Sequence, residues 1–259
     1  MSNEKYFLDS GSGLPILCVH GFPFDHTMWD VLAERISEDF RIIAPDLRGM
    51  GKNPQPVADV VMMAEFADDL ANFLDMQGIK KCVFCGLSMG GYIGWEFWKR
   101  HADRLYGIIL CDSNAGCDTP QAAENRERTA QRVLKEGTAF LAEAMIGNIL
   151  AQKTVLEKPE VVAHYRRMVE ENAPRGVAAA ARGLGMRRDF REMVKCMNLP
   201  VLVLSGSMDV LSPPERMREL VAEMPGAVYV EIPDAGHLAP LENPEDTARE
   251  VEAFCRQFL

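Results

Sequence analysis

The segment Gly86-Leu87-Ser88-Met89-Gly90 places a serine hydroxyl in the middle of a glycine-flanked turn. It follows the apolar run at 81–85 and precedes residues 91–100, whose pattern is compatible with a helix. A sharp turn from strand to helix strains its central residue, and the residues two positions away must be very small. The helix would direct its positive end toward charge that develops beside Ser88. This spacing favours a nucleophilic serine over a glycine-rich turn with an incidental serine.

A serine hydroxyl is a poor nucleophile unless a base removes its proton, and the chain offers five histidines for that task. His237 lies in a loop after the last predicted strand, beside a glycine. His20 precedes Gly21 and is expected to shape a turn. The others are expected at a turn, at a helix end and on a charged helix face: His26, His101 and His164. We therefore predict that His237 is the base.

The base needs a carboxylate that selects its tautomer and stabilises the imidazolium. Two candidates follow predicted strands: Asp209 comes after 201–204, and Asp112 comes after 105–111. We favour Asp209, because a glycine-bearing loop and a helix capped by Ser212 would hold it away from the strand end. The chain order is then nucleophile, acid, base.

Negative charge on a reacting carbonyl oxygen needs backbone N–H donors, each worth about 3–4 kcal/mol of barrier. Met89, directly after the serine, would supply one donor. The loop His20-Gly21-Phe22-Pro23 follows another predicted strand and would supply the second. Pro23 has no N–H, so Phe22 is the predicted donor, the alternative being that this loop is only a strand-ending turn.

Apolar runs that alternate with helical patterns predict an α/β fold. Continuous apolar runs are typical of strands buried on both faces of a mostly parallel sheet. Such runs occupy 15–19, 41–44, 81–85, 105–111, 201–204 and 228–232. Helical periodicity covers 65–76, and helix starts are predicted at Ser212 and Asn243. The carboxyl ends of the parallel strands would then gather the reactive side chains at one edge.

Residues 119–197 contain helical patterns and no convincing strand, which predicts a helical lid between core parts 1–118 and 198–259. We expect the lid to select substrate and to take no part in the catalytic group. Four apolar side chains are weak candidates for an acyl pocket, with core packing as the alternative: Phe24, Trp29, Met145 and Ile149. The lid arginines Arg182 and Arg187 could contact a substrate carboxylate, but solvated side chains are the simpler explanation.

Composition excludes several classes of partner. The chain has 259 residues, with 28 basic and 38 acidic side chains and a net charge of −10. This balance argues against nucleic acid and anionic membranes as partners. An odd number of cysteines, seven, argues against a disulfide framework, and Cys82 and Cys85 are expected to be buried and structural. Without a signal-peptide pattern or a membrane span, we expect a soluble, cytoplasmic protein.

Several motifs resemble the α/β-hydrolase superfamily across essentially the whole chain: HGFP at 20–23, DLRGMG at 46–51, GLSMGG at 86–91 and GH at 236–237. The resemblance implies an eight-stranded, mostly parallel sheet with a helical lid. Further motifs are similar to 3-oxoadipate enol-lactonases and related small esterases: HTMW at 26–29, RRDFRE at 187–192 and PGAVYVEIPDAGH at 225–237. Met50 departs from the histidine of many relatives, at a position expected to be structural.

The residues and the resemblance together predict a serine hydrolase, free of cofactor and metal, that cleaves a small carboxylic ester or lactone. Ser88 would attack the carbonyl, His237 would transfer the proton and Asp209 would orient His237. The same groups serve a perhydrolase or a carbon–carbon hydrolase, and a ligand receptor of this fold is a third alternative. These alternatives stay open from the sequence.

Overall fold

A seven-stranded sheet forms the centre of the described structure, a computed structural model that describes residues 5–36 and 39–259. The strand order is β1-β3-β2-β4-β5-β6-β7, and only β1 runs antiparallel to its neighbour. The strands are β1 Phe7–Gly11, β2 Leu14–Val19, β3 Phe40–Pro45, β4 Cys82–Leu87, β5 Leu105–Cys111, β6 Val201–Gly206 and β7 Val228–Ile232. Residues 1–4, where a signal peptide would begin, lie outside the described residues.

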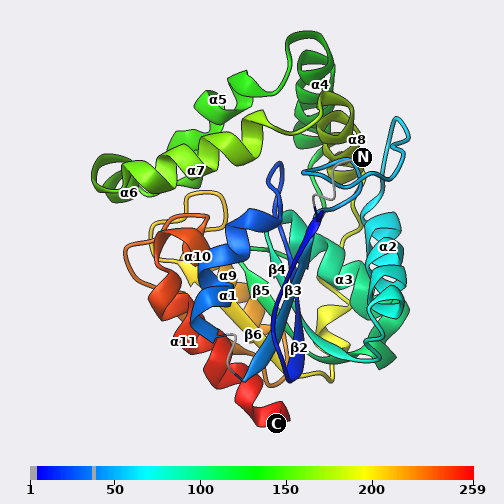
Figure 1. Ribbon diagram of the computed structural model, residues 1–259, viewed down its shortest axis with the longest axis vertical. Coiled ribbons are helices and arrows are strands. Elements are labelled where there is room, and N and C mark those ends of the chain that lie inside the picture. Colours follow the sequence, from blue (N-terminus) through cyan, green and yellow to red (C-terminus); the bar gives the residue numbers. More distant parts are fainter. Residues whose placement is uncertain (1–4, 37–38) are drawn as a thin grey trace.

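Helices cover both faces of the sheet. Figure 1 shows α2 and α3 on one face and α1 and α11 on the other, and helices of each pair pack together. The core helices are α1 Asp30–Ile36, α2 Met63–Met76, α3 Met89–His101, α9 Pro214–Ala222, α10 Ala239–Glu242 and α11 Pro244–Cys255. Short 3₁₀ helices are η1 His26–Trp29, η2 Ala102–Arg104, η3 Val194–Cys196 and η4 Arg256–Phe258. Burial of both sheet faces explains the continuous apolar runs.

Five helices between β5 and β6 lie across one end of the sheet (Figure 1). They are α4 Pro120–Glu136, α5 Ala139–Ile149, α6 Gln152–Glu157, α7 Pro159–Glu170 and α8 Pro174–Gly185. Helix α4 packs on α8, and α5 and α6 pack on α7. We call residues 119–197 the helical segment. None of the helices in the described ranges combines the length and apolar character needed to cross a membrane.

The six predicted strands appear as β2 to β7, and the α/β class is confirmed. The expected eighth strand does not occur among residues 5–36 and 39–259, which form seven. The start of α9 also differs from expectation. Pro213 occupies the N-cap position, and the Ser212 hydroxyl donates to the carbonyl oxygen of Asp112 at 3.0 Å. Asn243 does cap its helix, since its side chain accepts from the Asp246 N–H.

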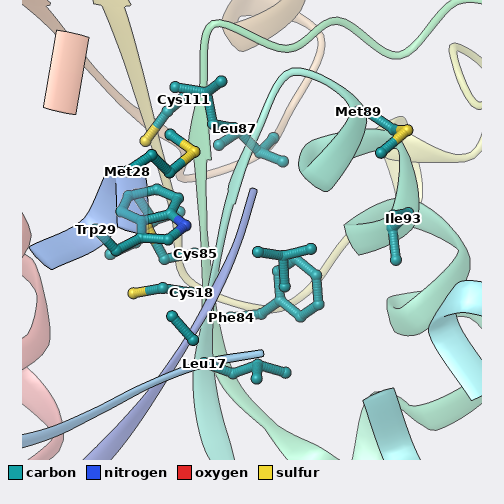
Figure 2. Packing of buried hydrophobic residues seen from close by; sticks show 14 of the residues in the cluster. Leu17, Cys18, Met28, Trp29, Phe84, Cys85, Leu87, Met89, Ile93 and Cys111 are labelled. Carbon is teal, nitrogen blue, oxygen red and sulfur yellow. The ribbon is translucent and has the colours of Figure 1, made fainter. Parts of the chain in front are cut away.

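The sheet core is apolar and includes sulfur atoms of cysteine and methionine (Figure 2). Trp29 lies beside Cys18 and Cys85 on one side of the strands, and Phe84 and Ile93 lie on the side of α3. All seven cysteines are free, and five of them are buried. Burial raises the pKa of Cys82 to about 12. Cys82 and Cys85 are therefore core side chains, as expected, rather than a redox pair.

Candidate active site

Ser88 occupies a strained turn between β4 and α3. Its backbone angles are φ 51° and ψ −110°, in a region that residues other than glycine rarely adopt. A Cβ atom on Gly86 would overlap the carbonyl oxygen of Gly90, and a Cβ on Gly90 would overlap that of Val19. The two flanking glycines are thus required by close backbone packing, as the sequence pattern predicts.

Hydrogen bonds from β5 and the residues after it hold this turn. The Ser88 N–H donates to the Cys111 carbonyl oxygen at 2.9 Å, and the Ser113 hydroxyl donates to the Ser88 carbonyl oxygen at 2.9 Å. The Ser88 side chain is half-buried. Because its peptide groups are bound to the neighbouring strand, the serine has a defined place at the carboxyl edge of the sheet.

His237 and Asp209 form a buried pair at the same edge. His237 Nδ1 lies 2.7 Å from Asp209 Oδ2, and both side chains are almost fully buried. Burial alone would raise the pKa of Asp209, but the hydrogen bond and charge of His237 and the N–H groups of Leu211 and Ser212 lower it. Asp209 is therefore an ionised acceptor, and its contact with Nδ1 favours the His237 tautomer that leaves Nε2 without a proton.

Asp112, the rival acid, lies close to this pair but is bonded differently. Its Oδ1 accepts from the Gly206 N–H at 2.8 Å, and its buried Oδ2 has no hydrogen-bond partner among the described residues. Burial and the negative charge of Asp209 raise the pKa of Asp112 well above its ordinary value. A neutral carboxyl group cannot stabilise an imidazolium by charge, whereas an ionised Asp209 can.

The other four histidines are engaged in structural contacts. His20 bonds through Nδ1 to the Gly21 carbonyl oxygen at 2.9 Å and through Nε2 to the Leu47 N–H at 3.0 Å. The remaining three contact side chains: His26 contacts Asp46 at 2.7 Å, His101 contacts Asp68 at 2.8 Å and His164 contacts Thr27 at 2.8 Å. Both ring nitrogens of His20 are thus engaged, one within its own turn and the other with the loop after β3.

The loop after β2 lies against the serine turn. Strands β2 and β4 are adjacent and parallel, with Val19 opposite Gly86, and Gly21 approaches the Leu87 side chain and carbonyl oxygen. The carbonyl oxygens of Val19 and His20 also approach Gly90 in the first turn of α3, where Met89 is the first helical residue. The first N–H groups of a helix have no partner within the helix, so the start of α3 can bind an oxyanion.

The helical segment contacts the loop that carries His237. The His237 N–H donates to the Ile149 carbonyl oxygen at 2.8 Å. The end of α5 docks directly on the loop after β7, and this satisfies a buried N–H that would otherwise lack a partner. Ser88, Asp209 and His237 themselves all lie outside the helical segment.

Two cavities adjoin this edge of the sheet, and Leu211 lines both. The lid cavity, about 520 Å³, has these apolar residues in its lining: Phe22, Phe140, Leu141, Ala144, Met145, Ile149 and Leu211. The rim cavity, about 810 Å³, is more polar, and its lining includes Asn114, Cys117, Asp118, Arg187, Leu211 and Ser212. Phe24 and Trp29 do not line either one and are fully buried in the core, so core packing explains them.

The arginines near these cavities have partners within the protein. In the lid cavity, Arg126 pairs with Asp118 at 3.1 Å. Arg187 pairs with the same carboxylate at 2.5 Å and stacks over the Tyr92 ring. Arg182 pairs with Glu127 at 2.8 Å. Arg182 and Arg187 are thus structural ion-pair residues rather than the solvated side chains expected.

Two groups of side chains have the residue types of a metal site. The first group is Asp25, His26 and Asp46, and the second is Asp112, Asp209 and His237. Within each group, one possible ligand atom from every residue lies within 4.8 Å of the other two. In both groups the short contact is 2.7 Å between nitrogen and oxygen. Two ligands of one tetrahedral zinc ion stand about 3.3 Å apart, so this distance fits a shared proton better than a shared metal.

The family follows from a match that covers most of the chain. A model described as the alpha/beta hydrolase family matches residues 16–250. The chain belongs to this family. The turn at Ser88, between a central strand and a helix, is the place where alpha/beta hydrolases carry their nucleophile.

Individual members of the alpha/beta hydrolase family are also similar. The structure of a thermophilic esterase from Thermogutta terrifontis is 44% identical, with a TM-score of 0.95 over 97% of this chain and 92% of that chain. An enol-lactonase from Burkholderia xenovorans is 28% identical, with a TM-score of 0.88 over 96% and 95% of the two chains. 3-Oxoadipate enol-lactonase 1 of Acinetobacter baylyi is 26% identical over 90% of this chain and 85% of its own. The resemblance to enol-lactonases and esterases is confirmed.

Sequence reasoning missed two residues of this region. Leu211 lies between the cavities, and its N–H donates to Asp209 Oδ1 at 2.7 Å. Glu242 is a fully buried carboxylate five residues after His237. A signal for Glu242 was present, because it is an acidic residue directly after the apolar stretch Leu238-Ala239-Pro240-Leu241.

Proposed function

We propose that this alpha/beta hydrolase cleaves a small carboxylic ester or lactone through an acyl-enzyme on Ser88. The observation that carries the proposal is the strained serine turn at the same sheet edge as the buried Asp209–His237 pair. The esterase and enol-lactonase relatives support the reaction class.

In the proposed reaction, His237 Nε2 accepts the proton of the Ser88 hydroxyl as its oxygen attacks the carbonyl carbon. The imidazolium that forms is stabilised by ionised Asp209 through Nδ1. The carbonyl oxygen becomes negative and is bound by the N–H groups of Phe22 and Met89. His237 then gives its proton to the leaving alkoxide, and a water molecule deprotonated by His237 hydrolyses the acyl-enzyme.

The two cavities suggest separate binding places for the acyl group and the leaving group of the substrate. Phe22 lines the lid cavity, which supports assigning the acyl group to the apolar part of that cavity, beside the proposed oxyanion site. We assign the leaving group to the more polar rim cavity. Leu211 would separate the two, next to the acid that its own N–H contacts.

A panel of esters and lactones of increasing acyl length, with and without hydrogen peroxide, tests the reaction class. We expect hydrolysis of small esters or lactones, with a mass increase of one acyl group on the peptide that contains Ser88 after rapid quenching. Peroxide-dependent oxidation that exceeds hydrolysis would favour a perhydrolase. Ligand binding without any turnover would favour a receptor and contradict the proposal.

A further inference from the structure

Glu242, the last residue of α10, places a carboxylate in the interior of the protein. It is fully buried. Its Oε1 accepts from the N–H groups of Gly236 at 2.9 Å and Leu238 at 3.2 Å, and its Oε2 accepts from the Ala151 N–H at 2.8 Å. Burial raises the pKa of Glu242, while the Thr154 side chain and these N–H donors act in the opposite direction. A carboxylate is retained here at a cost, which points to a specific use.

The three donors come from two parts of the chain that are distant in sequence. Gly236 and Leu238 flank His237 on either side, and Ala151 lies at the junction of α5 and α6 in the helical segment. The His237 N–H itself donates to Ile149 in the same junction. Every backbone N–H from 236 to 238 is thus bound either by Glu242 or by the helical segment.

We propose that Glu242 is a positioning residue that fixes the His237 loop against the helical segment and so sets the distance between His237 and Ser88. The proposal rests on the role of His237 as base in the proposed function. Proton transfer depends steeply on placement, and an error of about 1 Å can reduce turnover about 10²-fold. Glu242 acts through His237 and has no contact with substrate in this account.

The hydrogen-bond count explains why the residue must be a carboxylate. Three N–H groups converge on two oxygens, and an ionised carboxylate accepts at both. A glutamine of the same shape has one accepting oxygen and one NH₂ group. In either orientation its NH₂ group would face at least one backbone N–H, so either the His237 loop or the junction at Ala151 would lose its partner.

The test compares Glu242→Gln with Glu96→Gln. Glu96 is also a buried glutamate, on α3, and its carboxylate contacts Arg188 at 3.2 Å rather than the His237 loop. For each protein, kcat and KM are measured with one ester, the Nδ1 proton of His237 is observed by NMR, and a melting curve verifies folding. Glu242→Asp, which keeps the charge but shortens the side chain, replaces Glu242→Gln if the latter does not fold.

We expect Glu242→Gln to lower kcat about 10- to 100-fold, with KM changed less than about threefold, and to shift or broaden the His237 proton signal. Glu96→Gln should leave kcat and the signal unchanged. A folded Glu242→Gln protein with wild-type kcat, or with reduced kcat and an unchanged signal, would overturn the positioning role. Labelling of wild-type Ser88 by a fluorophosphonate distinguishes the two proposals. If only the positioning role of Glu242 is wrong, Ser88 is still labelled; if the proposed function is wrong, Ser88 does not react.

Discussion

At the scale of residues, the site depends on two carboxyl groups that lie near one imidazole but differ in charge. Asp209 receives hydrogen bonds from His237 and from the Leu211 N–H, and its pKa is lowered despite burial. Asp112 receives one from Gly206 and has a raised pKa. Environment rather than residue type therefore assigns the two roles.

Replacement of the two carboxyl groups should accordingly have very different effects on turnover. Asp209→Asn would lose the charge that stabilises the imidazolium and the acceptor that selects the His237 tautomer. We expect kcat to fall by about 10⁴, as in the comparable serine-protease substitution, and Asp112→Asn to cost less than about tenfold. Steady-state kinetics on one ester would check this. A larger loss of kcat for Asp112→Asn would mean that Asp112, after β5, is the acid instead of Asp209.

Asp112 also predicts a pH dependence of stability. Its pKa is raised in the folded protein by burial and by the charge of Asp209, with Cys111 and His237 also nearby. From about pH 4 upward the folded state therefore holds a proton that the unfolded state has lost, so this group lowers stability as pH rises. Asn at 112 has no such proton and can still accept from Gly206.

The measurable quantity is the difference in unfolding free energy between Asp112→Asn and the wild type. We expect this difference to rise in favour of the variant between pH 4 and pH 7, by up to about 1.4 kcal/mol per pH unit. Urea denaturation across this range measures it. A flat or falling difference would mean that Asp112 is ionised in the folded protein.

At the scale of elements, the turn between β4 and α3 and the helix α5 contain glycines with opposite requirements. Gly90 packs against the Val19 carbonyl oxygen, whereas a Cβ on Gly147 would meet nothing within 4 Å. Gly90→Ala should therefore destabilise the fold by at least about 2 kcal/mol through overlap with rigid backbone. Gly147→Ala, in an exposed helix interior, should stabilise it by about 0.5–1 kcal/mol. Denaturation curves that rank the two variants in the reverse order would contradict this account of the turn.

The helical segment predicts a change in acyl preference. Met145 on α5 lines the lid cavity, while Met186 is 61% exposed and outside that cavity. Each methylene buried by a longer acyl chain contributes about 0.8 kcal/mol, so loss of the Met145 side chain should change the ratio of kcat/KM values for short and long esters about tenfold. Met186→Ala should leave that ratio unchanged. Equal effects of the two substitutions would remove the lid cavity from substrate selection.

The Met145 substitution is preferable to one at Ile149 for this purpose. Ile149 is buried, and its carbonyl oxygen holds the His237 N–H, so a change there affects catalysis and packing together. Met145 is half-buried and offers a side-chain effect alone.

At the scale of the whole molecule, the sequence pattern predicted the strands that are buried on both faces of the sheet. The runs that became β2 to β7 are apolar because helices cover both faces of the sheet. β1 was not predicted because it pairs with only one strand, and its residues 7–11 are half-buried or exposed. Ser88 could be found because its tight turn leaves no space for a Cβ atom at Gly86 or Gly90, and this local requirement is visible in the sequence.

Contacts between distant segments could not be predicted from the sequence. The bond between Ala151 and Glu242 joins residues 91 positions apart, and it depends on where α5 and α6 settle on the sheet edge. The same docking brings Asn172 to the loop after β2, where its side-chain NH₂ donates to the Pro23 carbonyl oxygen at 2.8 Å. The helical segment is thus tied both to the proposed oxyanion loop and to the His237 loop.

We propose above that Ser88 is a nucleophile activated at the carboxyl edge of this sheet. The most direct measurement is labelling by a fluorophosphonate, followed by intact-mass analysis of the wild type and of Ser88→Ala. We expect one label per wild-type chain, located on the peptide that contains Ser88, and none on Ser88→Ala. Labelling that persists in Ser88→Ala, or a folded wild type that does not react, would contradict it.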